Sequence, residues 1–179
     1  DAATVTWSVA PDGTSIPNFI GVPSPPVGVQ QEIGGNSNLI ARMRQIYGPG
    51  PADPGDPGNT NFTDEAWYGH INESYNRWSS VSGLTMNYES TDDGAAFRTA
   101  AGSPGVRGDM RIGGHAIDGS SGVLAYNFFP SSGGDGVLDT LGNSYENLIN
   151  DSRKLRNVVV HEVGHGLGLT HTSGIANNM

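Results

Sequence analysis

The sequence contains no cysteine and few basic residues. Without cysteine the chain can form no disulfide scaffold, no thiolate zinc site and no cysteine nucleophile. Nine Lys and Arg residues stand against 18 Asp and Glu, so the formal net charge is −9 and nucleic acid is not an expected partner. Long hydrophobic runs are also missing, because no stretch approaches the roughly 20 apolar residues that a membrane-spanning helix needs.

The remaining composition favours one compact domain. The chain has 179 residues, a length that suits a single domain. Its 27 glycines and 11 prolines favour turns, but 35% of the residues are hydrophobic, which is enough for a core. We therefore expect residues 1–179 to form one domain, and we expect it to be a monomer.

Hydrophobic patterning predicts a domain that mixes strands and helices. Alternating β-branched and apolar residues indicate strands, whereas glycine-rich stretches at 48–60 and 133–139 are expected to be loops. The expected strands cover residues 4–9, 84–89, 108–113 and 122–129. Together with three helices, these strands indicate an α+β domain with a mixed sheet.

Three helices follow from apolar residues that recur three and four positions apart. A short helix is expected to begin at a cap formed by Asn36 or Ser37. A longer one covers residues 63–80, with Asp64 and Glu65 in its first turn, where the helix dipole favours anions. The last one covers residues 153–167.

The segment from His161 to His171 carries a metal-binding pattern and reads HEVGHGLGLTH. On a helix, His161 and His165 project from one face about 6 Å apart, so both imidazoles can bind one zinc ion. Glu162 lies beside the first ligand, at a position from which its carboxylate can reach a metal-bound water.

His171 lies beyond the helix that carries the first two histidines. The chain must turn before His171 can join them, and Gly168 gives the backbone the freedom to end the helix. Three histidines leave one coordination position open, which is typical of a catalytic zinc and not of a structural one. Three of the chain's five histidines fall in this pattern, so the signal is more specific than a lone HExxH.

The motif resembles that of the metzincin metallopeptidases, which is HExxHxxGxxH followed by a methionine turn. Met179 lies eight residues after His171, and the same gap is found in the matrixins, the family of matrix metalloproteinases. Other segments that resemble matrixins are WSSVSGLTMNY at 78–88, GDMRI at 108–112 and GSSGVLAYNFFP at 119–130. The resemblance covers residues 63–179.

The matrixin resemblance implies a fold and an activity. The fold is a zincin-like α+β domain with a five-stranded, mixed and twisted sheet, about three helices including the zinc-binding one, and a cleft across the sheet. The activity is that of a secreted zinc endopeptidase, here of bacterial origin, which cleaves proteins or peptides. The backbone of Leu124 and Ala125 would pair with an extended substrate, and Met179 would support the zinc site without binding the metal. Because the chain ends at Met179, whether the native protein continues beyond this residue stays an open question.

Two other ion sites of matrixins are altered in this sequence. Matrixins hold a second, structural zinc with three His and one Asp, and at two of these positions the chain has Tyr126 and Val137. We therefore expect one catalytic zinc and no structural zinc. Asp118 and Asp139 match calcium ligands, but the glutamate that should accompany them is Gly142, so calcium binding stays open.

The motif also predicts a mechanism. Zinc held by the three histidines would supply a Lewis acid, which lowers the pKa of a bound water and stabilises negative charge on the oxygen of the cleaved carbonyl group. Glu162 takes the proton of the water as general base and passes it to the leaving amine. Two alternatives stay open: a metzincin of another branch that acts on few proteins, and a non-catalytic extracellular module that keeps the zinc site.

Overall fold

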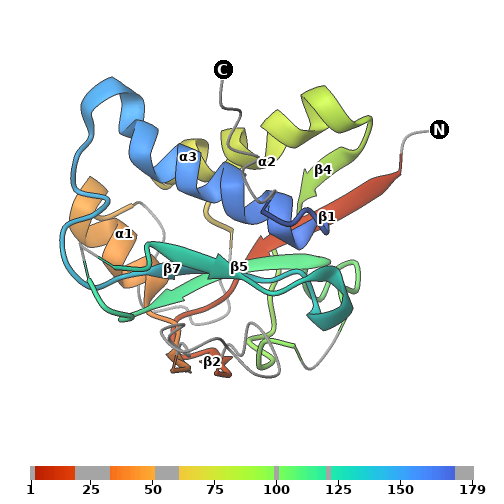
Figure 1. The fold of residues 1–179 in the computed structure, drawn as a ribbon, viewed down its shortest axis with the longest axis horizontal. Coiled ribbons are helices and arrows are strands. Elements are labelled where there is room, and N and C mark those ends of the chain that lie inside the picture. The colour runs from red at the N-terminus through yellow and green to blue at the C-terminus, as the bar shows by residue number, and fades with distance from the viewer. Residues whose placement is uncertain (1–2, 19–32, 51–60, 99–100, 120–121, 172–179) are drawn as a thin grey trace, which may run out of the picture.

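A five-stranded sheet forms the centre of the computed structural model, which describes residues 3–18, 33–50, 61–98, 101–119 and 122–171. The strands are β1 (Thr4–Val9), β4 (Thr85–Tyr88), β5 (Met110–His115), β6 (Ala125–Asn127) and β7 (Gly136–Asp139). Their spatial order is β4-β1-β5-β7-β6 (Figure 1). All neighbouring strands are parallel except β6, which is antiparallel to β7. The sheet is therefore mixed, as predicted, and β6 is an edge strand.

Three α-helices accompany the sheet in the described residues: α1 (Leu39–Tyr47), α2 (Tyr68–Ser82) and α3 (Ile149–Gly166). α2 and α3 lie side by side over one face of the sheet, and α3 contacts β6 and β7 (Figure 1). A small ribbon of β2 (Ser15–Ile16) and β3 (Gly35–Asn36) and a 3-10 turn at Pro130–Ser132 are the remaining elements described. No helix in these ranges is both long and apolar enough to cross a membrane. The predicted α+β class, with a five-stranded mixed sheet and three helices, is confirmed.

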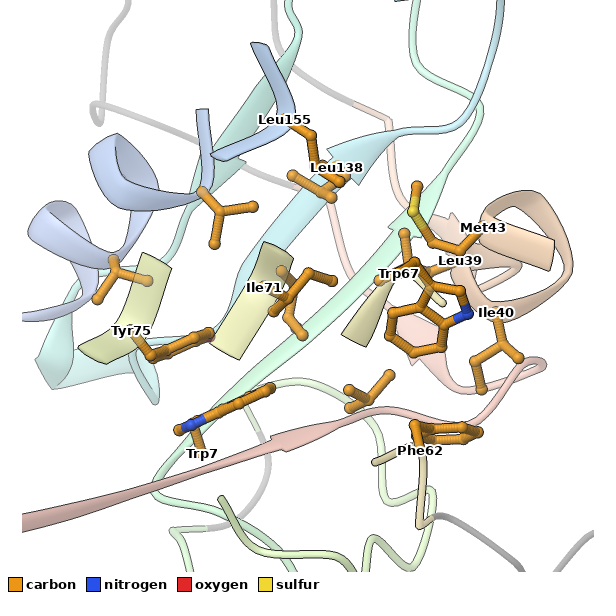
Figure 2. Packing of buried hydrophobic residues seen from close by; sticks show 14 of the residues in the cluster. Trp7, Leu39, Ile40, Met43, Phe62, Trp67, Ile71, Tyr75, Leu138 and Leu155 are labelled. Carbon is orange, nitrogen blue, oxygen red and sulfur yellow. The ribbon is translucent and has the colours of Figure 1, made fainter. Parts of the chain in front are cut away.

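The main core lies between the sheet and the helices. Trp7 of β1 stacks on Tyr75 of α2, with ring centroids 4.3 Å apart and planes at 5°. Leu138 of β7 and Leu155 of α3 belong to the same cluster (Figure 2). Val137, the neighbour of Leu138, points to the opposite face and into a smaller cluster, because side chains alternate along a strand. Both faces at the centre of the sheet are therefore covered.

Strand β7 corrects the prediction that residues 133–139 form a loop. All four residues of β7 are buried, and the strand lies between β5 and β6. A Cβ on Gly136 would lie 2.7 Å from Oδ1 of Asn127, so close packing against β6 explains this glycine. The glycines that indicated a loop belong in part to a strand that has little room for side chains.

The start of α2 is a second correction. The helix begins at Tyr68, so Asp64 and Glu65 precede it and do not lie in its first turn. Glu65 is buried, and its Oε1 accepts a hydrogen bond from Nε of Arg44 on α1 at 2.9 Å. This ion pair between distant segments, and not the helix dipole, explains the position of Glu65.

The start of α1 is capped by a distant residue and not by the predicted cap at 36–37. The carboxylate of Asp12 accepts hydrogen bonds from the amides of Ile40 at 3.0 Å and Ala41 at 2.9 Å. These two amides are among the first of the helix, which have no partner within it. An aspartate in the turn after β1 therefore does what a local N-cap side chain would do.

Candidate metal centre

Two histidines lie one turn apart on α3. The Nε2 atoms of His161 and His165 are 3.1 Å apart. Residues 150–152 have φ between 54° and 58°, in the left-handed region, so the regular right-handed helix starts at Arg153, as predicted. Both histidines lie in the last two turns of this regular segment.

A tight turn after α3 brings in the third histidine. The amide of Gly168 donates to the carbonyl of His165 at 2.9 Å, in a turn of the Schellman type. Gly168 has φ +99°, a conformation that L side chains rarely adopt. Nε2 of His171 then lies 2.9 Å from Nε2 of His161 and 3.1 Å from Nε2 of His165.

The three imidazoles fit a metal ion better than they fit one another. Nδ1 of His165 lies 2.7 Å from the carbonyl oxygen of Leu169, which only accepts, so Nδ1 is assigned the proton and Nε2 presents a lone pair. Each Nε2 atom of a neutral ring either donates or accepts a hydrogen bond. Three Nε2 atoms in mutual contact therefore cannot all form hydrogen bonds with one another. Tetrahedral zinc, with Zn–N distances of about 2.0–2.1 Å, places its ligand nitrogens about 3.3 Å apart, close to the observed separations. Among the described residues, only these histidines form a metal-binding group of three or more side chains.

Glu162 lies beside this group with its carboxyl buried. The residue is 8% exposed, and burial raises its pKa to about 7. Its Oε2 is a buried atom with no hydrogen-bond partner in the described part of the chain. Burial also lowers the pKa of His161, as do the nearby His165 and His171, which favours the neutral ring that binds metals. A carboxylate with a free oxygen beside such rings is suited to taking a proton from water.

A tryptophan that sequence reasoning did not assign to the site holds α3 in place. Trp78 of α2 donates from Nε1 to the carbonyl of Val160 at 2.9 Å, one residue before His161. A Cβ on Gly164 would lie 2.9 Å from Cζ2 of Trp78, so the helices approach this closely only with glycine there. In the sequence, the glycine between His161 and His165 was the local sign that this face of the helix packs closely against another element.

An open cavity of about 380 Å³ lies between the edge strand and α3, next to His161. Ala125, His161 and Glu162 are among the residues that line it. Ala125 lies opposite Leu138 of β7 at a position of the ladder without hydrogen bonds, so its amide and carbonyl point to the open edge. The strand that was predicted to bind substrate therefore has a free backbone edge beside the candidate site.

Leu124, the second predicted substrate contact, is placed differently. Its carbonyl accepts hydrogen bonds from the amide of Asp139 at 2.8 Å and from the hydroxyl of Tyr145 at 2.5 Å. The carbonyl of Leu124 faces into the molecule and is already hydrogen-bonded. The backbone amide and carbonyl of Ala125 are therefore better placed than the Leu124 carbonyl to pair with a substrate strand.

The positions of the matrixin structural zinc are part of the core here. Val137 has no exposed surface, and Tyr126 is 6% exposed in the same cluster. The Tyr126 hydroxyl lies 3.0 Å from Nε2 of His115, while Nδ1 of His115 lies 2.9 Å from the carbonyl of Ala116. Both ring nitrogens of His115 therefore have protein partners. That the chain holds no structural zinc stays a prediction.

Asp139 and Asp118, the predicted calcium ligands, bind backbone amides. The carboxylate of Asp139 accepts hydrogen bonds at 2.7–2.8 Å from the amides of Ile117, Gly119 and Leu141. Oδ2 of Asp118 accepts one from the amide of Val123 at 3.1 Å. These bonds hold the backbone at Ile117, Gly119, Val123 and Leu141, and calcium binding stays a prediction. Met179, the predicted supporting methionine, lies outside the described residues.

Comparison with known proteins gives both a family and individual relatives. The matrixin family model matches residues 57–179, which is more than half of the chain. Matrix metalloproteinase-26 from Homo sapiens is 37% identical over 59 residues, which cover 33% of this chain and 23% of the relative. Matrix metalloproteinase-16 from Rattus norvegicus is 33% identical over 115 residues, which cover 58% of this chain and 18% of the relative. The chain thus spans less than a quarter of the length of either relative.

The matched region contains α2, strands β4 to β7 and α3, and therefore all the residues that build the candidate site. The five-stranded mixed sheet, the three helices of the described residues and the cluster of three histidines are consistent with that match. The chain belongs to the matrixin family of zinc metalloendopeptidases.

Proposed function

We propose that this domain is a zinc-dependent endopeptidase that hydrolyses peptide bonds in proteins, with Glu162 as its general base. One observation carries the proposal: three imidazole nitrogens converge at 2.9–3.1 Å beside a buried carboxyl group that has a free oxygen. Zinc held by His161, His165 and His171 would supply a Lewis acid, which acidifies water and polarises a carbonyl group.

The chain's own groups would bind the substrate and move the proton. The amide and carbonyl of Ala125 would pair with an extended peptide, which adds to the sheet as a further strand beside β6. Glu162, which lines the cavity beside the histidines, would accept a proton from the attacking water on its carboxylate and later give it to the leaving amine. The cavity between β6 and α3 would take a substrate side chain next to the cleaved bond.

We also propose that residues 1–179 act as one secreted, monomeric domain. The family match begins at residue 57, but β1 lies in the middle of the sheet between β4 and β5. Removing β1 would divide the sheet, so the segment that carries it belongs to the same domain as the site. Membership in the matrixin family supports the proposed extracellular location.

Substitution Glu162→Gln tests the proposed function. The variant keeps the size of the side chain but removes the base, so kcat/KM on a quenched peptide library should fall by about 10²-fold or more while zinc stays bound. Glu73→Gln is the matched control, because Glu73 is an exposed glutamate on α2. Undiminished cleavage by Glu162→Gln would show that the base is another group. No cleavage by the zinc-loaded parent would favour the non-catalytic module.

A further inference from the structure

The cavity beside the candidate metal centre adjoins a second cavity along α3. The first has a volume of about 380 Å³ and lies between β6 and α3. The second, of about 280 Å³, is lined by Arg153, Lys154 and Ile149 among others. Asn157 and Val158 line both cavities, so the two form one groove that runs from the metal centre toward the start of α3.

This groove follows a single stripe of the helix. Lys154, Val158 and His161 are four and three residues apart, a spacing that places them on one face of α3. With a rise of 1.5 Å per residue, Lys154 lies about 10 Å along the helix axis from His161. An extended peptide advances about 3.3 Å per residue. A substrate cleaved at the metal centre would therefore bring its third or fourth residue from the cleaved bond beside Lys154 and Arg153.

Arg153 and Lys154 are free cations in an acidic chain. Five of the other arginines form ion pairs: Arg42 with Glu146, Arg44 with Glu65, Arg107 with Asp93, Arg111 with Asp92, and Arg156 with Glu73. In the ranges that the structure describes, no ion pair or hydrogen bond engages the side chains of Arg153 and Lys154, and both residues are exposed.

In the part of the chain that the structure describes, no acidic side chain pairs with these two cations. Asp151, the nearest acid in the sequence, turns toward α2, with its carboxylate 3.6 Å from His70 and from Arg156. Among the residues that line the two cavities, only Glu162 is acidic, and it lies at the other end of the groove.

We propose that Arg153 and Lys154 form a basic subsite, which selects substrates with an Asp or Glu three or four residues from the cleaved bond. The inference rests on the proposed endopeptidase function and adds a substrate class to it. The guanidinium of Arg153 can hold a carboxylate through two parallel hydrogen bonds, and the ammonium of Lys154 adds a second charge. Because the subsite is open to water, the preference should be several-fold and should weaken in salt.

Quenched peptides with one shared cleavable sequence test the subsite. Glu, Gln or Lys is placed in turn at each position on either side of the cleaved bond. With the zinc-loaded parent at low salt, kcat/KM for the Glu peptide should exceed that for the Gln peptide about threefold to tenfold. The effect should occur only at the third or fourth position on one side, Lys should be disfavoured there, and high salt should bring the ratios toward one.

Two double variants assign the preference to these residues. R153Q with K154Q should lower kcat/KM for the Glu peptide to that for the Gln peptide, and R153E with K154E should make Lys the preferred residue. Arg77→Gln is the matched control, because Arg77 is an exposed cation on α2 that lines neither cavity. The control should keep the preference for Glu.

The outcomes separate this inference from the proposed function. If the parent cleaves the Glu, Gln and Lys peptides equally well, the subsite is wrong and the endopeptidase function stands. If the zinc-loaded parent cleaves no peptide, the proposed function itself is wrong. A preference for Glu that persists in R153Q with K154Q would place the acidic specificity elsewhere in the cleft.

Discussion

Two buried carboxyl groups of this domain, Glu162 and Asp135, have pKa values that burial raises to about 7. Asp135 lies just before β7 and accepts hydrogen bonds from the amides of Arg111 at 3.0 Å and Arg98 at 3.4 Å. The charge of Arg111 lowers the pKa of Asp135 in part, but its guanidinium forms its hydrogen bonds with Asp92, with Nε 2.8 Å from Oδ2, so the effect of burial prevails. The same desolvation thus gives a potential base at the cleft and, in the interior, a carboxyl group whose charge is only partly compensated.

Asp135→Asn should stabilise the protein at neutral pH. The unfolded carboxyl ionises near pH 4 but the folded one only near pH 7, so the folded state loses stability as the pH rises through this window. Asparagine cannot ionise and still accepts from the Arg111 amide, although the weaker Arg98 bond is lost. We expect a gain on the order of 2 kcal/mol at pH 8 and little change at pH 4, measured by urea denaturation.

Asp93→Asn is the control with the opposite sign. Hydrogen bonds from Arg107 lower the pKa of Asp93 to about 2, so its ionised form stabilises the folded state above pH 4, and this stabilisation is lost as the pH falls toward 2. Asp93→Asn should therefore reduce stability at pH 7 and have less effect at pH 2. A gain at pH 7 for Asp93→Asn, or a loss at pH 8 for Asp135→Asn, would contradict this account.

At the scale of elements, the end of α3 is fixed by close contacts with two strands and a loop. A Cβ on Gly166 would lie 2.3 Å from Cε of Met110, 2.7 Å from the carbonyl oxygen of Gly134 and 2.8 Å from Nδ2 of Asn127. The methionine end can move, but the backbone oxygen cannot move without shifting the loop before β7. The glycine therefore sets how closely the helix that carries His165 approaches the sheet.

Gly166→Ala should damage both stability and metal binding. Overpacking of this kind costs about 1–3 kcal/mol, and the shift of the last turn should weaken zinc affinity because it separates His165 from His171. Gly69→Ala on α2 is the matched control, because a Cβ there meets nothing within 4 Å, and it should be neutral or slightly stabilising. Urea denaturation and chelator competition measure the two effects. Unchanged zinc affinity in Gly166→Ala would refute the coupling.

Elements with local signals were predictable from the sequence, and those fixed by distant partners were not. The regular start of α3 at Arg153 and the turn at Gly168 follow from residue types within a few positions of each feature. Strand β7 was missed because its glycine reflects contact with Asn127 on another strand. Glu65 was misplaced for the same reason, since its partner Arg44 lies on another helix.

The residues of the candidate site differ in the same way: those close in the sequence could be predicted, and those from distant segments could not. The convergence of the three histidines could be predicted because a helix and one turn bring them together within eleven consecutive residues, and the role of Glu162 stays a prediction. Trp78, which supports α3 from α2, could not be assigned, because its bond to Val160 joins residues 82 positions apart. The basic end of the groove was missed as well, because a run of Arg and Lys at the start of a helix resembles any solvated surface until the adjoining cavities are known.

At the scale of the whole molecule, the two faces of the sheet differ in what packs against them. The face that carries α2 and α3 holds the larger core (Figures 1 and 2). The candidate metal centre lies at the end of α3, on the same face. The opposite face is closed by a smaller cluster that includes Tyr126, Phe97 and Val137. There the bond between Tyr126 and His115 links β6 to the end of β5. A protein hydrogen bond thus joins strands at the place where the family resemblance implies a structural zinc.

Zinc analysis of the whole protein tests that replacement. After dialysis the parent should hold about one zinc per chain, because the described residues contain one group of three ligands and His115 already has partners at both nitrogens. Tyr126→Phe should leave zinc content near one but lower the melting temperature, since a buried acceptor without a donor costs about 1–3 kcal/mol. His165→Ala should lose the zinc. Two zinc ions per parent chain, or zinc lost on Tyr126→Phe with His165 unchanged, would mean that the opposite face binds metal and that its tyrosine is part of an ion site.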